Sequence, residues 1–203
     1  MSVILLISPL AKKIPLIEGA DYAGVDAGAL RCMEQGISMV FALGDFDTAK
    51  GTYSSIEKEV VCYRLPTRKD ETDMESAVYE AIERNYDQII LYGVLQGRFD
   101  HTMANLYLLL HRFPFLILMD ENNRVRVLSK GTYIFQKEYT YLSFLALEKS
   151  CMSEEGVSYP LDHKQIDTSD IFTVSNEIIG TQAVITLHEG RVLMIEANDN
   201  ESL

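Results

Sequence analysis

Four apolar runs in the first 120 residues constrain the fold more than any other feature of the sequence. The runs VILLI, MVFAL, QIILYGV and FLILM are long enough to form buried strands, and segments with helical spacing lie between them. Strands that are buried on both faces and alternate with helices are typical of a mostly parallel sheet covered by helices. We therefore expect an α/β fold for the first part of the chain.

The pattern changes after residue 123, where short strands with polar residues between them follow one another without a convincing helix. The expected strands are RVRVLS, TYIFQK, YTYLSFLALE, IFTVS, QAVITLHE and RVLMIEA, with a hairpin turn at His188-Glu189-Gly190 between the last two. Such a series is typical of a β-sandwich or barrel-like domain. The sequence thus predicts a Rossmann-like α/β domain at residues 1–122 and a β-sandwich at residues 123–203.

Charge and composition exclude several classes of protein. The formal net charge is −12, which argues against a basic groove for nucleic acid. The N-terminal SVILLIS is too short for a membrane span and has no preceding positive charge, so we interpret it as a first strand and not as a signal peptide. The cysteines Cys32, Cys62 and Cys151 lack CxxC spacing, which favours reduced thiols. We expect a cytoplasmic protein without nucleic-acid or membrane partners.

Two helices are specified by local signals. Thr72 and Glu75 form a T-x-x-E capping box before an apolar stripe, and Asn85 is a plausible stop. A second helix is expected to open near Asp100, after a glycine-punctuated turn. Its expected buried side consists of Met103, Leu106, Tyr107 and Leu110.

Acidic residues follow three of the predicted strands: Asp26 in VDAGA, Asp45 and Asp47 in GDFDT, and Asp100 in GRFDH. Carboxyl ends of parallel strands share one edge of a sheet, where ligands bind in open α/β folds. Carboxylates that converge there repel each other by about 1 kcal/mol per pair at about 4 Å even in water, so a divalent cation is the natural partner. Oxygen ligands suit Mg²⁺, and a magnesium-bound nucleotide is the expected ligand.

Other interpretations of these residues stay open. Asp and Gly are common in turns, and Asp70 and Asp73 are also the acids expected at a helix start. No GxxxxGK[ST] motif occurs, so a P-loop is excluded. The histidines His111, His163 and His188 show no ligand spacing, which argues against a zinc site.

Five blocks in order, VDAGA (25–29), GDFDT (44–48), KDETDMESA (69–77), GRFDHTMANL (97–106) and SNE (175–177), resemble the thiamin pyrophosphokinase family. The resemblance implies an enzyme that transfers diphosphate from ATP to the hydroxyl of thiamin and releases AMP. It also implies a magnesium- and nucleotide-binding catalytic domain followed by a thiamin-binding and dimerisation domain. The family's homodimer implies active sites at the subunit interface.

The resemblance assigns roles to individual residues. It implies metal-binding acids at Asp45, Asp47, Asp73 and Asp100. It implies catalytic roles for Asp73, Arg98 and Asp100, with Arg98 near the phosphates. Nucleotide binding is implied for Asp26, Gly28, Asp45, Asp47, Thr72, Arg98 and His101, although His101 is also interpreted as a residue that holds the helix start. Ser175 and Asn176 are the implied thiamin-binding residues.

The sequence departs from the family pattern in three places. Leu95 and Gln96 stand where the family usually has a threonine and a glycine, and the usual GDFDS ends in Thr48. No tryptophan occurs, so stacking on thiamin must come from Tyr, Phe or His. Two alternatives therefore accompany the main hypothesis. One is a diphosphokinase for another alcohol, such as a pterin or pyrimidine, and the other is a non-catalytic sensor of thiamin or nucleotide.

Overall fold

The computed structural model describes residues 1–46, 53–66 and 70–199. The chain divides into two compact units, Met1–Glu121 and Asn122–Leu203. The first is an α/β domain and the second is built from antiparallel strands. Their succession confirms the fold class predicted from the sequence.

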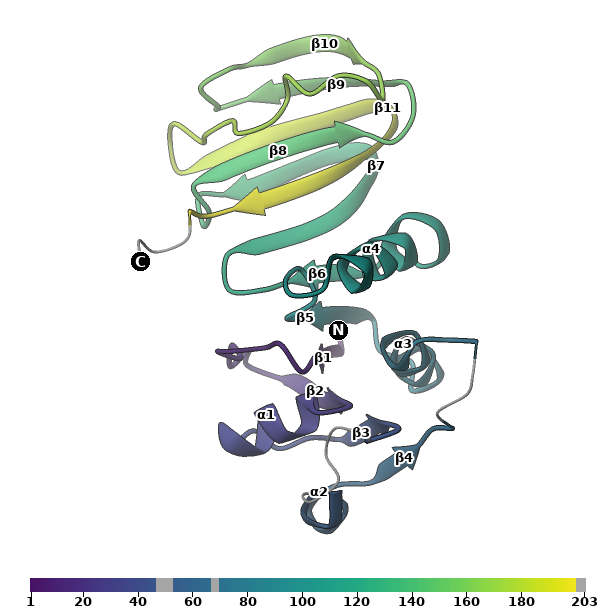
Figure 1. Cartoon of the computed structure of the whole chain (residues 1–203). Helices are drawn as coiled ribbons and strands as arrows, with labels where there is room; N and C mark the ends of the chain where they lie inside the picture. Colours follow the sequence, from purple (N-terminus) through teal and green to yellow (C-terminus); the bar gives the residue numbers. More distant parts are fainter. Residues whose placement is uncertain (47–52, 67–69, 200–203) are drawn as a thin grey trace. The chain divides into compact units, whose positions relative to one another are not determined.

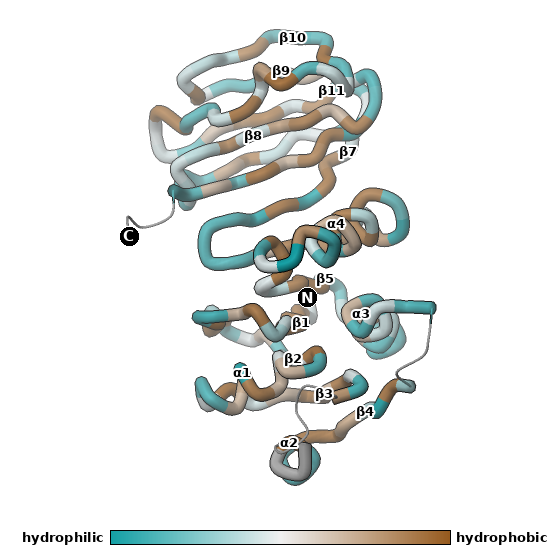
Figure 2. The backbone as a smooth tube through the Cα atoms, viewed as in Figure 1, coloured by the Kyte–Doolittle hydropathy of each residue, from teal (hydrophilic) through white to brown (hydrophobic). Residues whose placement is uncertain are grey.

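The first unit contains a parallel sheet with the strand order β6-β5-β1-β2-β3-β4 (Figure 1). Its strands are β1 (Val3–Ile7), β2 (Ala20–Val25), β3 (Phe41–Gly44), β4 (Cys62–Arg64), β5 (Gln88–Tyr92) and β6 (Ile117–Met119). Figure 2 shows β1 and β3 as apolar segments, and most of their side chains are fully buried. Burial on both faces explains why these strands are continuous apolar runs and do not alternate.

Helices cover this sheet. They are α1 (Gly28–Glu34), α2 (Tyr53–Glu59), α3 (Asp73–Glu83), α4 (Phe99–Tyr107) and the π-helix η2 (Leu108–Arg112). Helix α3 packs against β1, β2, β3 and β5, whereas α1 packs against β1 and β2. The buried residues of α3 include Met74, Ala77, Val78 and Ala81 of the apolar stripe expected from the sequence, whereas Ile82, also expected there, is 37% exposed. None of the helices in the described ranges is long and apolar enough to cross a membrane.

The buried side expected for α4 is wrong, since Met103, Leu106 and Leu110 are only half-buried and the fourth residue, Tyr107, is exposed. This residue is 58% exposed, whereas Asn105, Leu108 and Leu109 are buried. The helix continues after Tyr107 as the π-helix η2, in which hydrogen bonds span five residues instead of four. The buried residues Asn105, Leu108 and Leu109 are spaced as on one face of an α-helix, but this face is rotated from the expected one, because the consecutive apolar residues 108–110 do not fix the face from the sequence alone.

Up to residue 199, where the described part of the chain ends, the second unit is a β-sandwich of five strands. They are β7 (Asn123–Gln136), β8 (Tyr141–Ala146), β9 (Ser150–Glu155), β10 (Leu161–Ile166) and β11 (Gln182–Ala197). Strand β11 pairs along its whole length with β7, and on its other edge it pairs first with β9 and then with β8. Strand β10 pairs with β9. The core of this unit includes Phe135, Phe144, Met152, Ile185 and Met194.

Several strand predictions in this unit are wrong in detail. The hairpin turn expected at His188-Glu189-Gly190 is an irregularity inside the single strand β11, where Gly190 has φ 83° and the pairing register shifts. RVRVLS and TYIFQK likewise lie in one strand, β7. The segment IFTVS, at 171–175, is not a strand. Strands β9 and β10 were not expected, because SCMSEE and LDHKQI lack the alternation of a half-buried strand.

The three cysteines are free, as expected. Cys32 and Cys151 are buried, and Cys62 is half-buried. Burial raises the pKa of Cys32 to about 12, so this thiol stays protonated and packs as a small apolar side chain.

Candidate active site

Two of the predicted acids lie at the ends of neighbouring strands. Asp26 follows β2 and Asp45 follows β3, and these strands pair in parallel. The main-chain N–H of Asp26 donates to the carbonyl of Leu43 over 2.8 Å. A Cβ atom added to Gly44 would lie 2.8 Å from the Cα of Asp26, so only glycine permits this approach. Both aspartates are half-buried at this edge of the sheet.

Gly28 opens helix α1 against the end of β1. A Cβ atom there would lie 1.9 Å from the carbonyl oxygen of Ile7. Close packing of helix on strand therefore explains this glycine without a ligand. Its predicted contact with nucleotide stays a prediction.

Thr72 caps helix α3, as its capping-box position predicts. Its Oγ1 accepts a hydrogen bond from the main-chain N–H of Glu75 over 3.1 Å. The carboxylate of Glu75 pairs with the guanidinium of Arg112. Asp73 is half-buried in the first turn of the helix, where a carboxylate is favoured by the helix dipole.

Arg98 and Asp100 form a bidentate ion pair at the start of α4. Nε of Arg98 donates to Oδ1 of Asp100 over 3.1 Å, and Nη2 donates to Oδ2 over 2.5 Å. The hydrogen bonds and charge of Arg98 lower the pKa of Asp100 to about 2. The main-chain N–H of His101 also donates to Oδ1 of Asp100, over 3.0 Å. His101 thus contributes a main-chain hydrogen bond to the first turn of α4.

The loop that departs from the family pattern is anchored to the segment after β1. The side-chain amide of Gln96 donates to the carbonyl of Leu10 over 3.0 Å. The hydroxyl of Ser8 donates to the carbonyl of Gly93 over 2.6 Å. Gln96 therefore holds the loop before Arg98 through its side-chain amide, a group that threonine and glycine lack.

A cavity of about 440 Å³ is lined by residues from the starts of both α3 and α4. Thr72 and Glu75 line it from α3, and Asp100 lines it from α4. Its other lining residues are Met103, Ala104, Tyr107, Leu108, His111 and Arg112. Arg112 was not predicted from the sequence, because an arginine 37 positions from Glu75 gives no local signal of their pairing.

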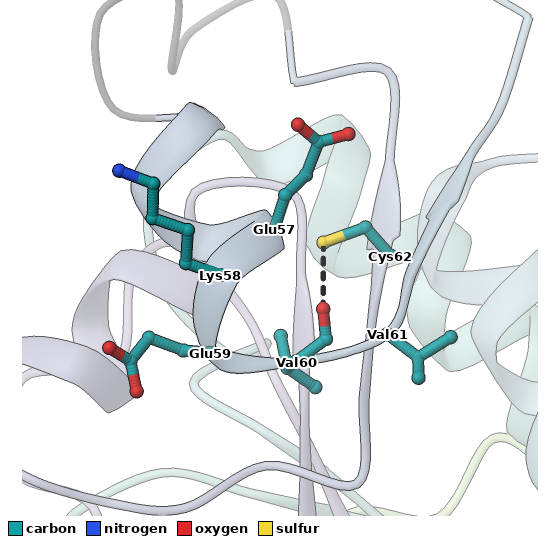
Figure 3. A pocket seen from close by; sticks show the side chains of 6 residues that line it. All are labelled: Glu57, Lys58, Glu59, Val60, Val61 and Cys62. Atoms are coloured by element: carbon teal, nitrogen blue, oxygen red, sulfur yellow. Dashed lines mark hydrogen bonds between the residues drawn. The ribbon is translucent and has the colours of Figure 1, made fainter.

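A second hollow, of about 430 Å³, is formed by the consecutive residues 57–62 (Figure 3). None of the predicted site residues lines it. The thiol of Cys62 donates to the carbonyl of Val60 over 3.6 Å. Burial and the negative charge of Glu57 raise the pKa of Cys62. A thiol kept protonated in this way is a poor nucleophile, so this hollow is not a candidate for catalysis.

The predicted metal ligands are only partly described. Asp47 lies outside the described residues. Within residues 1–46, 53–66 and 70–199, no group of three His, Cys, Asp or Glu side chains is close enough to hold a metal ion. Two histidines that looked scattered do meet, since the rings of His163 and His188 stack with centroids 4.0 Å apart. Parallel rings at 14° do not direct their nitrogens at a common ion.

In the β-sandwich, Ser175 and Asn176 occupy different environments. Ser175 is exposed and has φ 61°, and its main-chain N–H donates to Oγ of Ser143 over 2.8 Å. Asn176 is 5% exposed, and its side chain bonds within the domain. Tyr159, whose main chain bonds to this amide, is 75% exposed. Tyr159 is thus an exposed aromatic residue next to the predicted thiamin-binding pair.

The fold and these sites define a two-domain protein with a parallel α/β domain, charged residues at its strand ends, and a following β-sandwich. Residues 16–117 match the family described as thiamin pyrophosphokinase, catalytic domain. Residues 132–192 match the thiamin pyrophosphokinase, vitamin B1 binding domain. The chain belongs to the thiamin pyrophosphokinase family, as the sequence motifs indicated.

Individual relatives agree with this assignment. The thiamine pyrophosphokinase of Bacillus subtilis (strain 168) is 29% identical over 187 residues, which cover 88% of this chain and 87% of the relative. The crystal structure of thiamine pyrophosphokinase from Bacillus subtilis has a TM-score of 0.86 at 27% identity and covers 98% of this chain and all of that one (100%). A thiamin pyrophosphokinase family protein from Enterococcus faecalis has the same TM-score, 0.86, at 26% identity, with 98% and 100% coverage.

Proposed function

We propose that this protein transfers diphosphate from ATP to the hydroxyl of thiamin in a Mg²⁺-dependent reaction that yields thiamin diphosphate and AMP. The observation that carries the proposal is the set of charged residues at the strand ends of the α/β domain. Asp26 and Asp45 end neighbouring strands, and the Arg98–Asp100 pair follows β5. Such an edge is where α/β domains bind ligands. We propose a cytoplasmic location, because the three cysteines of this chain are free thiols, which persist in a reducing compartment.

The donor groups at this edge fit Mg²⁺. Asp45 offers carboxylate oxygens, the ligands that hard divalent cations prefer, and Asp26 follows the neighbouring strand. Gly44 permits the close approach of the main chain at Asp26, which a Cβ atom would prevent. Asp45, Asp47, Asp73 and Asp100 are the residues that would hold the ion. When bound, it would draw negative charge from the phosphates.

The ion does not require three protein carboxylates to be assembled in advance. Mg²⁺ is usually held by one or two carboxylates, with water and substrate phosphates as the remaining ligands. The binding residues would therefore complete the site only together with the nucleotide. Asp100 uses both carboxylate oxygens on Arg98, so metal binding by Asp100 would weaken that pair.

The roles of the other residues follow from phosphoryl-transfer chemistry, in which positioning and charge stabilisation dominate. Arg98 would stabilise the negative charge that develops on the transferred group. Asp100 would orient the attacking hydroxyl, since a carboxylate with a pKa of about 2 is a poor base for an alcohol. Asp26, Gly28, Thr72 and His101 are the further residues proposed to contact the nucleotide.

The β-sandwich would bind the acceptor. The exposed hydroxyl of Ser175 offers a polar contact, and the ring of Tyr159 offers an aromatic face. Asn176 would act indirectly, because its amide is bonded within the domain. We also propose a homodimer in which each active site uses both subunits, as the family resemblance implies.

A panel of acceptors tests the proposed activity. Purified protein is incubated with Mg-ATP and, separately, thiamin, a hydroxymethyl pterin or a hydroxymethyl pyrimidine, and AMP release is measured. We expect AMP to appear with thiamin and not with the other alcohols. AMP release with only a pterin or pyrimidine would support the alternative diphosphokinase. Tight thiamin binding by calorimetry without turnover would support a sensor.

A further inference from the structure

Glu154 is a buried acid inside the β-sandwich. It lies on β9 and is 1% exposed. In the strand register it lies between Leu161 of β10 and Ile185 of β11. A carboxyl group in such apolar surroundings is costly unless it is hydrogen-bonded. Its retention in the core therefore calls for a specific partner.

That partner is the side-chain amide of Asn176. Its Nδ2 donates to Oε2 of Glu154 over 2.8 Å and to the carbonyl of Tyr159 over 3.0 Å. Its Oδ1 accepts from the main-chain N–H groups of Tyr159 and Glu177, each over 3.0 Å. Both donor hydrogens and both lone pairs of the amide are thus used inside the domain.

The main-chain groups of Tyr159 and Glu177 fix how this amide faces, and the carboxyl of Glu154 accepts its remaining N–H. An ionised carboxylate only accepts hydrogen bonds, so Nδ2 and not Oδ1 of Asn176 must point at it. In this orientation Asn176 binds both the N–H and the carbonyl of Tyr159. A flipped amide would set its oxygen against the carbonyl of Tyr159 and lose these bonds.

The same residue also fixes the segment that carries Ser175. The main chain of Asn176 exchanges two hydrogen bonds with Leu142, over 2.8 and 3.1 Å. Ser175 is held in the left-handed region, at φ 61°. A non-glycine residue keeps this conformation only where its surroundings enforce it. Asn176 thus connects the buried carboxyl of Glu154 to Tyr159 through its side chain and to Ser175 through the main chain.

We propose that Glu154 is a positioning residue for the acceptor: through Asn176 it holds Tyr159 and Ser175 where they contact thiamin. This inference rests on the proposed function, because it requires thiamin to bind at these residues. Burial also raises the pKa of Glu154 to about 7, opposed by its hydrogen bond from Asn176. The contact therefore involves a group whose charge changes near neutral pH.

Steady-state kinetics of three variants test the proposal. Glu154→Leu removes the acceptor of the Asn176 amide, and we expect a KM for thiamin about tenfold higher, with kcat and the KM for ATP changed less than about twofold. Glu154→Gln keeps an acceptor oxygen and is expected to restore the KM for thiamin to within about threefold of the parent. Glu155→Gln changes the exposed neighbour on the same strand and is the matched control.

The outcomes separate this inference from the proposed function. An unchanged KM for thiamin in Glu154→Leu, or a parallel loss of kcat and of affinity for both substrates, would overturn the positioning role. If Glu154→Leu does not fold, Glu154→Asp takes its place, since it keeps the charge but withdraws it from Asn176. A parental KM for thiamin in that variant would equally overturn the proposal. Absence of thiamin-dependent turnover in the parent protein would instead refute the proposed function, and the inference with it.

Discussion

The guanidinium of Arg98 donates two hydrogen bonds, of 3.1 and 2.5 Å, to the carboxylate of Asp100, which lies only two residues further along the chain. Because Arg98 is the N-cap residue of α4 and Asp100 lies in its first turn, the pair is held at the end of the helix that follows β5. The pKa of Asp100 falls to about 2, so its carboxylate stays ionised throughout the neutral range. Asp100 is therefore not the source of any change in activity near neutral pH.

Loss of the Arg98 guanidinium should impair catalysis more than binding. We expect Arg98→Gln to lower kcat by about 100-fold, because a donor that stabilises developing charge is worth about two orders of magnitude. Arg98→Lys should recover only part of the activity, since an ammonium cannot form the bidentate pair. Arg31→Gln, which removes an exposed cation of α1, is the control. An Arg98→Gln enzyme with parental kcat would show that this cation takes no part in the transition state.

Asp73→Asn should separate folding from activity. Asparagine is tolerated near a helix start, so the loss of the carboxylate should reduce the free energy of unfolding by only about 0.3–1 kcal/mol. Activity in Mg-ATP should fall by about 100-fold or more if Asp73 binds the metal. Circular dichroism during urea unfolding and an AMP-release assay measure the two effects. Asp70→Asn, at the exposed acid just before this helix, should leave both unchanged, and full activity of Asp73→Asn would refute the metal role.

The hydroxyl of Thr72 has a measurable effect on stability. Thr72→Ala removes the acceptor of the Glu75 N–H and should lower the free energy of unfolding by about 1 kcal/mol. Thr72→Ser keeps the cap and should unfold at nearly the parental urea concentration. The same two variants test the predicted nucleotide contact. If the hydroxyl of Thr72 also binds ATP, Thr72→Ala will raise the KM for ATP. Equal stability of all three proteins would contradict the capping role.

Tyr159 should contribute to acceptor affinity through its ring. Tyr159→Ala is expected to raise the KM for thiamin by about tenfold, as loss of an aromatic stacking contact of about 1.4 kcal/mol would do. Tyr159→Phe keeps the ring and should stay within about threefold of the parent. Ile171→Ala removes another exposed apolar side chain, 77% exposed, and serves as the control. A KM for thiamin that is insensitive to Tyr159→Ala would exclude this residue as the aromatic partner.

Glu154 should make stability depend on pH. Its pKa rises from an ordinary value of 4.5 to about 7 in the folded protein. Between these values the folded state binds more protons than the unfolded state, so the free energy of unfolding decreases as pH rises. The total decrease should be about 3 kcal/mol. Urea unfolding of the parent, Glu154→Gln and the control Glu155→Gln from below pH 5 to above pH 8 measures it, and a decrease that persists unchanged in Glu154→Gln would contradict this origin.

Much of the α/β domain was predictable because its signals are local. The runs VILLI and QIILY are buried on both faces and form the central strands β1 and β5. The capping box at Thr72 is visible within four residues, and the start of α4 near Asp100 follows from the preceding glycines. Each of these features depends on residues close together in sequence. The expected positions of Asp26 and Asp45 followed from strand ends in the same way.

The features that were missed depend on distant partners. SCMSEE looks like a polar segment, but Ser150 to Glu154 are buried because β10 and β11 flank this strand and the sandwich core covers it. The bond from Asn176 to Glu154 joins residues 22 positions apart, and no periodicity predicts it. Gly190 looked like a turn residue, yet its positive φ serves an irregularity within β11. The glycine was thus recognised as a position with special main-chain conformation, but the pairing of β11 with distant strands decides that it forms an irregularity and not a turn.

We propose that the strand-end residues of this chain support the transfer of an intact diphosphate from ATP to thiamin. The most direct measurement is product analysis by ion-exchange chromatography after incubation of the purified protein with thiamin, ATP and Mg²⁺. We expect thiamin diphosphate and AMP in equal amounts, with neither product formed after chelation of the metal. Formation of thiamin monophosphate with ADP, or no thiamin-dependent consumption of ATP, would contradict it.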